Sequence, residues 1–316
     1  KMARLSLDNL KENIFGVFYV MTEQSVYYNK DNFWSTFRVC VLYLLDAGQV
    51  LRALFSSQYG WSTGISSVTS NFDMLTFATN MIPHPSFTSG ILYLVAVVIV
   101  ILAFAISGLA MHVCQSGTTT RYLWPVKLLR FLVATLVTTF FLTILRLLLF
   151  PLNCSEGAIR GDVDTLSEWM RGTGSPCTPW ASPEVAITLP SIALALAFVV
   201  FSLTATLLSF EVNPISEAPG HRFTGRVEAL WSTVRVSVVV ISHVHQYITP
   251  VAALALLTIH VSFLVWAHVE VLPFHSHGFN MLRGGIYMGV FWIALASTVT
   301  SAIMNKDDPD NSDTSA

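Results

Sequence analysis

Charged side chains are scarce in this sequence. Asp, Glu, Lys and Arg together make up 11% of its 316 residues, whereas 53% are hydrophobic. A soluble domain of this length needs far more charge to solvate its surface. The formal net charge is only −2, so the concentrated basic face that nucleic-acid binding requires is missing as well. The composition therefore argues against a soluble globular fold and against nucleic acid as a partner.

Several catalytic and binding motifs are also missing. The sequence has no P-loop, no glycine-rich dinucleotide fingerprint, no G-x-S-x-G elbow and no potassium-channel selectivity filter. No lysine lies inside a predicted span, since Lys127 is at an edge, and this excludes a retinal Schiff base. Residues 1–31 hold no apolar run of the signal-peptide type, so we expect the first spanning helix to act as the signal anchor. These absences favour a protein that is not an enzyme.

The sequence does contain a series of apolar runs of about 20 residues, the length that crosses a roughly 30 Å hydrocarbon layer as a helix. They predict an all-α, polytopic transmembrane helical bundle with about seven spans. The fifth and sixth runs form a tight hairpin if they are two helices. In chain order the predicted spans are Phe33–Phe55, Ile91–Val113, Lys127–Phe150, Ala186–Phe210, Glu228–Gln246, Thr249–Val271 and Arg283–Met304.

Polar segments flank the predicted bundle of residues 33–304. Residues 1–32 carry apolar side chains at helical spacing, which is typical of an amphipathic helix that lies on the membrane surface or packs against the bundle. Residues 305–316 form a polar, acidic tail, which we interpret as a truncated loop of a longer protein. Most Lys and Arg residues of the short loops fall on the side of the N-terminus, so the N-terminus is predicted to be cytoplasmic.

The four cysteines fall into two groups. Cys40 and Cys114 lie in a span or at its cytoplasmic end, and we expect free thiols there. Cys154 and Cys177 share the outside loop between the third and fourth spans, where an oxidising compartment favours a disulfide worth about 3 kcal/mol. Two unpaired thiols are the alternative for this loop.

Ionisable residues inside a span are costly, and each is a candidate for function. Asp46, Arg235 and His260 lie nearest the middle of their spans. Asp46 lies well around the first helix from Arg38 and Arg52, so we expect it to pair with Arg235. Such a pair either fixes the helix register or, with His260, contributes to a proton or ion pathway. Other arginines are close enough to a helix end to snorkel to the interface: Arg38, Arg52, Arg130 and Arg146.

Histidines gather near the sixth and seventh spans. Imidazole and carboxylate ligands for zinc or a similar transition metal are offered by His268, Glu270, His275 and His277. The i, i+4 histidine pair of a metalloprotease helix is missing, however. Haem bound through axial His112 and His260 on different helices is a further option. No other cofactor is expected.

Gly285 and Gly289 form a GxxxG motif on the seventh span. Such small residues let helix backbones approach closely, and packing within the chain is the use that we expect here. The expected partners of the protein are the lipid bilayer and other membrane-protein subunits or further copies of the chain.

Several short motifs resemble those of a known family. In the second half of the chain they are Val227-Glu228-Ala229-Leu230-Trp231, Leu272-Pro273-Phe274, Asn280-Met281-Leu282-Arg283-Gly284-Gly285 and Phe291-Trp292; in the first half they are Asn13–Tyr19, Leu44–Gln49 and Tyr59–Trp61. Together they resemble the membrane region of the tiny-macrocyst B/C (TmcB/TmcC-like) polytopic membrane proteins of algae and protists. After Leu-Pro this chain departs from the expected Tyr-Asn pattern with Phe274-His275-Ser276-His277.

The resemblance implies a polytopic membrane region that is followed by a further helix and by cytoplasmic sensory modules, often of PAS type. We therefore expect a non-enzymatic integral membrane component of a sensory or signalling assembly in the plasma or ciliary membrane, with a link to an ion pathway as an option. Two alternatives stay open. One is an ion channel or transporter that uses Asp46, Arg235 and His260, and the other is a structural subunit of a large membrane complex.

Overall fold

The structure is a computed structural model that describes residues 33–55, 59, 61, 85–115, 128, 135–152, 185–208, 224–244 and 249–307. Every regular element in these ranges is a helix, which confirms the all-α class. Four helical segments are long and apolar enough to cross a membrane: Ile91–Leu109, Val185–Leu207, Pro250–Val271 and His277–Ile303. These segments are consistent with the predicted multi-pass membrane protein.

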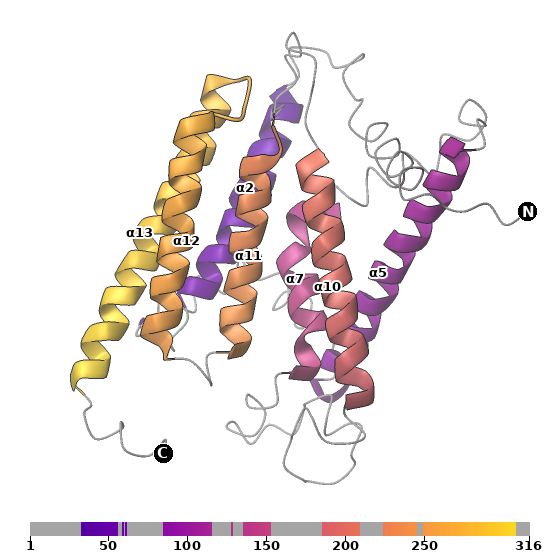
Figure 1. The fold of residues 1–316 in the computed structure, drawn as a ribbon, viewed down its shortest axis with the longest axis horizontal. Helices are drawn as coiled ribbons and strands as arrows, with labels where there is room; N and C mark the ends of the chain where they lie inside the picture. The colour runs from indigo at the N-terminus through magenta and orange to yellow at the C-terminus, as the bar shows by residue number, and fades with distance from the viewer. Residues whose placement is uncertain are drawn as a thin grey trace, which may run out of the picture.

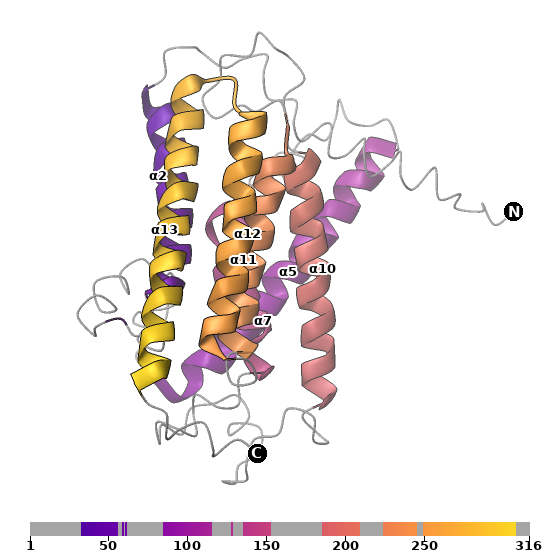
Figure 2. The same ribbon diagram turned by 60° about the vertical axis from the view of Figure 1, so that its left-hand side comes forward.

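The helices stand side by side in one bundle (Figure 1). The long helices are α2 (Phe33–Leu54), α5 (Pro85–Gln115), α10 (Val185–Leu208), α11 (Arg226–Val244), α12 (Pro250–Val271) and α13 (His277–Asp307). Helix α13 packs along α12 and also contacts α2, while α11 contacts α2, α10 and α12. In Figure 2, α5 crosses the bundle at an incline to α10 and α11. Helices α2, α11 and α13 therefore lie together on the side of the bundle away from α5 (Figure 1).

The sequence of helix α11 explains which of its faces is buried in the bundle. Its buried apolar residues Val227, Trp231, Val234 and Val238 recur at spacings of three and four, which is one stripe of an α-helix. Buried residues on α12 follow the same spacing and face α11 and α13. Outward positions are apolar too, as in Leu256, which is 64% exposed. Apolar side chains on both the inner and outer faces are what a helix in lipid requires.

The predicted spans match most helices closely. The starts and ends of α2, α10 and α12 lie within two residues of the predicted ones. Helix α5 begins at Pro85 and α13 at His277, each six residues earlier than predicted. Helix α13 also continues to Asp307, so residues 305–307 are helical and do not belong to the predicted tail. The error has a simple cause, since a polar turn of helix outside the lipid carries no apolar signal.

The third predicted span, Lys127–Phe150, is not one continuous helix where the structure describes it. It consists of the π-helical turn η4 (Thr135–Thr139), the short α-helix α7 (Phe141–Leu148) and the 3-10 turn η5 (Phe150–Leu152). The amide of Phe140 donates to the carbonyl of Thr135, a wide turn that replaces the usual four-residue step. Polar partners on other helices use the carbonyl groups of this turn, as described below.

Some sequence predictions concern residues outside the described ranges. These are the amphipathic segment 1–32, the Cys154–Cys177 disulfide and the tail residues 308–316. Cys40 is a free thiol, as predicted. The side chain of Cys114 is outside the description as well.

Candidate functional site

Four charged side chains meet inside the bundle. Asp46 comes from α2, Glu228 and Arg235 from α11, and Arg283 from α13; their exposed fractions are 3%, 5%, 3% and 1%, respectively. Two of them are acidic and two are basic, so their formal charges cancel. We call this set the charge network and treat it as the candidate functional site.

Asp46 is bound from two other helices. Arg235 donates from Nη1 to Asp46 Oδ1 at 3.0 Å, and Arg283 donates from Nη2 to Oδ2 at 3.3 Å. The indole N–H of Trp231 also donates to Oδ2. The predicted pair of Asp46 and Arg235 is therefore confirmed, and the structure adds a second arginine to it.

Glu228 and Arg283 form the second half of the network. Arg283 donates from Nε to Glu228 Oε1 at 2.9 Å and from Nη2 to Oε2 at 2.8 Å. This two-pronged geometry is the strongest form of a carboxylate–guanidinium pair. The hydroxyl of Tyr287 donates to Oε1 at 2.9 Å. Arg283 thus bridges the two acidic residues, one on α2 and one on α11.

Arg235 connects the network to the π-helical turn η4. Its Nη1 donates to the carbonyl of Val137 at 2.9 Å, and its Nη2 donates to Ser232 Oγ at 2.8 Å. The guanidinium also lies 4.5 Å from the centre of the Phe141 ring. A second bond to η4 comes from Gln49, which donates to the carbonyl of Thr139 at 2.8 Å. The irregular turn therefore supplies acceptors to polar groups that have no water around them.

Aromatic rings surround the guanidinium of Arg283. Its central carbon lies 4.4 Å from the ring centre of Tyr43, 5.1 Å from Tyr287 and 5.2 Å from Trp231. One ring comes from each of α2, α13 and α11. Cation–π attraction is strongest at such desolvated positions, so the three helices hold the arginine by their rings as well as by their carboxylates.

Sequence reasoning missed Glu228 and Arg283 as members of the site. Both were placed at the edge of a predicted span, where a charge reaches water easily. The structure instead places Glu228 in the first turn of α11 and Arg283 well inside α13, and both face the core. A usable signal was present, because Glu228 precedes Trp231 by three residues and Arg283 precedes Tyr287 by four, which puts each charge on the apolar face of its helix.

His260 is not brought to Asp46 and Arg235. Its Nε2 lies 2.9 Å from Thr233 Oγ1, and its Nδ1 lies 3.1 Å from Ser237 Oγ. At roughly 100° per residue, Thr233 and Ser237 are on the opposite face of α11 from Arg235. The structure also gives no support to the haem option. Both ring nitrogens of His260 are engaged, and the other proposed ligand, His112, is exposed on α5.

The predicted metal ligands do not converge. His268 is buried, and its Nε2 donates to the carbonyl of Asn280 at 2.9 Å, whereas Glu270, His275 and His277 are exposed. Side chains that are two residues apart on a helix point in roughly opposite directions, so His268 and Glu270 lie on different faces of α12. In the part of the chain that the structure describes, no group of three or more His, Cys, Asp or Glu side chains is placed to hold a metal ion.

The GxxxG glycines do not make the expected close contact. Both Gly285 and Gly289 are exposed, and apart from neighbouring residues of the same helix no described atom lies within 4 Å of a Cβ built at either position. The close approach is at Gly284 instead. A Cβ there would lie 3.2 Å from Cδ2 and Nε2 of the His268 ring. The small residue that lets α12 and α13 pack is therefore one position away from the motif.

Comparison with known proteins gives two distant relatives. The chain is 23% identical to tiny macrocysts protein C of Dictyostelium discoideum over 303 residues, which cover 94% of this chain and 20% of that protein. It is 24% identical to tiny macrocysts protein B of the same organism over 308 residues, with 95% and 20% covered. The chain spans about a fifth of the length of these curated relatives. No family model matches the chain, and no solved structure matches it.

Proposed function

We propose that this chain is a non-enzymatic, membrane-embedded helical module of a sensory or signalling assembly. The observation that carries the proposal is the charge network, which joins α2, α11 and α13 through directional contacts inside an apolar bundle. The two relatives support the idea of a module, because the match covers nearly all of this chain and only a fifth of each relative.

A network of this kind is more than is needed to hold helices together. Buried ion pairs can often be replaced by apolar residues of similar volume at little cost or with a gain in stability. Arg283 already contacts both Asp46 and Glu228. A shift of α13 along α11 would therefore strengthen one of these two contacts and weaken the other, while the charges stay balanced. Two alternative sets of contacts are what a two-state switching element requires.

The proposal includes a finer topology. We propose seven crossings, which are formed by α2, α5, the broken segment that contains α7, and α10 to α13. Helices α2, α11 and α13 carry the buried charges of the network, and their composition is less apolar than that of α5, α10 and α12. The excess of Lys and Arg places the N-terminus in the cytoplasm. Residues 1–32 are proposed to lie along the membrane surface.

The test measures whether α2 and α13 move relative to each other. Spin labels are attached at Leu44→Cys and Met288→Cys, both outward-facing positions, after the four native cysteines are replaced by serine. The protein is reconstituted in vesicles, and the distance between labels is measured while pH, osmotic tension and lipid composition are varied. We expect at least one stimulus to change the distance distribution, because the ion pairs have alternative partners.

The matched control replaces all four charges of the network by apolar residues of similar size. This variant is expected to fold and insert but to show one distance under every condition. The same single distance in the parent protein would contradict the proposal and favour a purely structural subunit. Ion flux through parent vesicles that Asp46→Asn abolishes would instead favour a channel or transporter.

A further inference from the structure

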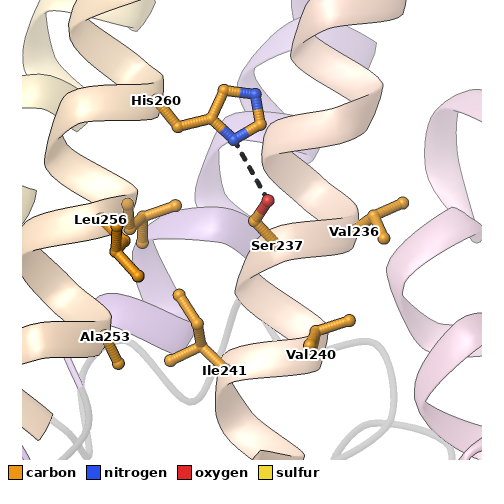
Figure 3. A pocket seen from close by; sticks show the side chains of 8 residues that line it. Val236, Ser237, Val240, Ile241, Ala253, Leu256 and His260 are labelled. Atoms are coloured by element: carbon orange, nitrogen blue, oxygen red, sulfur yellow. Dashed lines mark hydrogen bonds between the residues drawn. The ribbon is translucent and has the colours of Figure 1, made fainter.

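An apolar groove lies between α11 and α12, on the face of α11 that points away from the charge network. Its volume is about 340 Å³. The walls come from Val236, Val240 and Ile241 on α11 and from Ala253, Leu256 and Leu257 on α12 (Figure 3). The small side chain of Ala253 is one reason why the two helices leave space here. The role inferred for the groove rests on the membrane embedding proposed above, but not on the sensory or signalling role.

His260 and Ser237 form the polar end of the groove, and their polar atoms are already engaged. Figure 3 shows the bond between the His260 ring and Ser237, with an N···O distance of 3.1 Å. The second ring nitrogen of His260 lies 2.9 Å from Thr233 Oγ1. Ser237 Oγ also donates to the carbonyl of Thr233 at 3.0 Å. An occupant would therefore meet an almost entirely apolar surface, which favours a hydrocarbon over a polar ligand.

The groove is open at the side of the bundle. At its rim, Leu256 is 64% exposed and Val240 is 44% exposed. Helix α12 is one of the segments that are long and apolar enough to cross a membrane, and His260 is near the middle of it. The opening therefore faces the hydrocarbon layer and not the headgroups, and its polar end lies near the depth where acyl chains terminate.

We propose that this groove binds one acyl chain of a membrane lipid, with the end of the chain against His260. The size is suitable, since an apolar cavity of about 150 Å³ accepts benzene and a space more than twice as large accepts a longer hydrocarbon. A sterol fits less well, because its hydroxyl belongs at the headgroup level whereas the only polar end of the groove is in the middle of α12.

The experiment uses phosphatidylcholine with a photoreactive diazirine near the end of one acyl chain. The purified chain is reconstituted with this lipid and irradiated, and labelled peptides are identified by mass spectrometry. We expect labelling to concentrate on residues 236–241 and 253–260 compared with the exposed Leu196, which lies at a similar depth in the middle of α10. Equal labelling of the groove and of Leu196 would overturn the proposal, because it would indicate only general contact with lipid.

Two neighbouring alanines supply the variant and its control. Ala253 lines the groove, whereas Ala252 is exposed and does not. The substitution Ala253→Trp should fill the groove and lower labelling of residues 236–241 at least fivefold, and Ala252→Trp should leave it unchanged. If Ala253→Trp aggregates on size exclusion, Ala253→Leu is used, with a loss of at least twofold expected. Equal labelling of both variants, or displacement of the chain by a photoreactive sterol, would show that the proposal is wrong.

Discussion

Arg283 is the least exposed of the four residues in the charge network. Its guanidinium contacts both carboxylates, and three aromatic rings surround it. Only 1% of the residue is exposed, so water contributes almost nothing to its solvation. An arginine suits this position better than a lysine, because a planar guanidinium can bind two oxygens of one carboxylate and stack on rings at the same time.

Removal of the Arg283 charge should therefore strongly reduce the stability of the protein. We predict that Arg283→Met destabilises the protein by about 3–5 kcal/mol, because Glu228 would be left as a buried charge without its ion-pair partner. The measurement is thermal unfolding in detergent, followed by size exclusion. Arg226→Met, at an exposed position on the first turn of α11, is the control and should change stability by less than about 0.5 kcal/mol.

A second variant tests the cause of that loss. Glu228→Leu combined with Arg283→Met removes both charges of the pair, so it should be more stable than Arg283→Met alone. Equal stability of Arg283→Met and Arg226→Met would mean that the network does not hold the bundle together.

At the scale of single residues, sequence reasoning recovered half of the network. Asp46 and Arg235 were found because they are oppositely charged and lie in the middle of their spans. Glu228 and Arg283 were missed because a charge near a helix end is usually solvated, although their spacing to Trp231 and Tyr287 indicates the apolar face of each helix. His260 was grouped with Asp46 and Arg235 only because all three lie near the middle of their spans. This position does not tell which face of its helix a residue occupies.

At the scale of elements, the turn between α12 and α13 is held in a fixed geometry. Leu272 ends α12 in the left-handed region at φ 46°, and its amide donates to the carbonyl of His268 at 2.8 Å. The side chain of Asn280 then accepts from the amide of Phe274 at 3.0 Å and donates to its carbonyl at 2.8 Å. These bonds provide partners for backbone N–H and C=O groups of the turn, and they fix the direction in which α13 follows α12.

The contact between α12 and α13 depends on Gly284. We predict that Gly284→Ala destabilises the protein by about 1–3 kcal/mol, because the added methyl would lie 3.2 Å from the His268 ring. That ring has little room to move, since it donates to Asn280 and packs edge-on against Tyr287 with ring centres 5.2 Å apart. The midpoint of thermal unfolding in detergent measures the effect.

The adjacent glycine provides the control for this prediction. Apart from neighbouring residues of the same helix, no described atom is within 4 Å of a Cβ at Gly285, so Gly285→Ala should leave stability unchanged or raise it by up to about 1 kcal/mol through its better helix propensity. An unfolding midpoint of Gly284→Ala at or above that of Gly285→Ala would contradict the packing seen between the helices.

The elements themselves were predictable where the apolar run was continuous. Helices α2, α10 and α12 agree with the predicted spans because their composition changes abruptly at both ends. The broken third span was not predictable in the same way. Its π-helical turn is coupled to donors from Arg235 and Gln49, which are distant in the sequence. An apolar run predicts that a segment lies in lipid. It does not predict a bend that depends on hydrogen bonds to side chains of other helices.

At the scale of the whole molecule, the charge network is buried inside the bundle, whereas many apolar side chains of the described helices face outward. The network lies between α2, α11 and α13, while residues such as Leu196 and Val200 on α10 are 61% and 62% exposed. This inversion of the usual soluble pattern was predictable from composition, because 11% charged residues cannot cover a surface. Which helices are neighbours could not be predicted, since it depends on contacts between segments far apart in the chain.

The topology gives a prediction for the molecule as a whole. Thr249 and Ser276 lie at opposite ends of α12 and are exposed. In the proposed topology the N-terminus is cytoplasmic and the chain crosses the membrane seven times, so Thr249 should face outside and Ser276 the cytoplasm. Single cysteines at these positions, in a chain otherwise free of cysteine, are labelled with a membrane-impermeant maleimide.

In intact cells only Thr249→Cys should react, and Ser276→Cys should react after permeabilisation. The reverse pattern would mean that the orientation is inverted. Reaction of both cysteines in intact cells would mean that α12 does not cross the membrane.

The position of Asp46 on the first described helix affects how the protein is made. Its two arginine partners follow it by 189 and 237 residues. At roughly 5–20 residues per second, the ribosome needs roughly 10–50 s to synthesise that stretch. During this interval the newborn helix holds a carboxylate whose two arginine partners have not yet been made. We therefore expect its release from the insertion machinery into lipid to be delayed until α11 and α13 emerge.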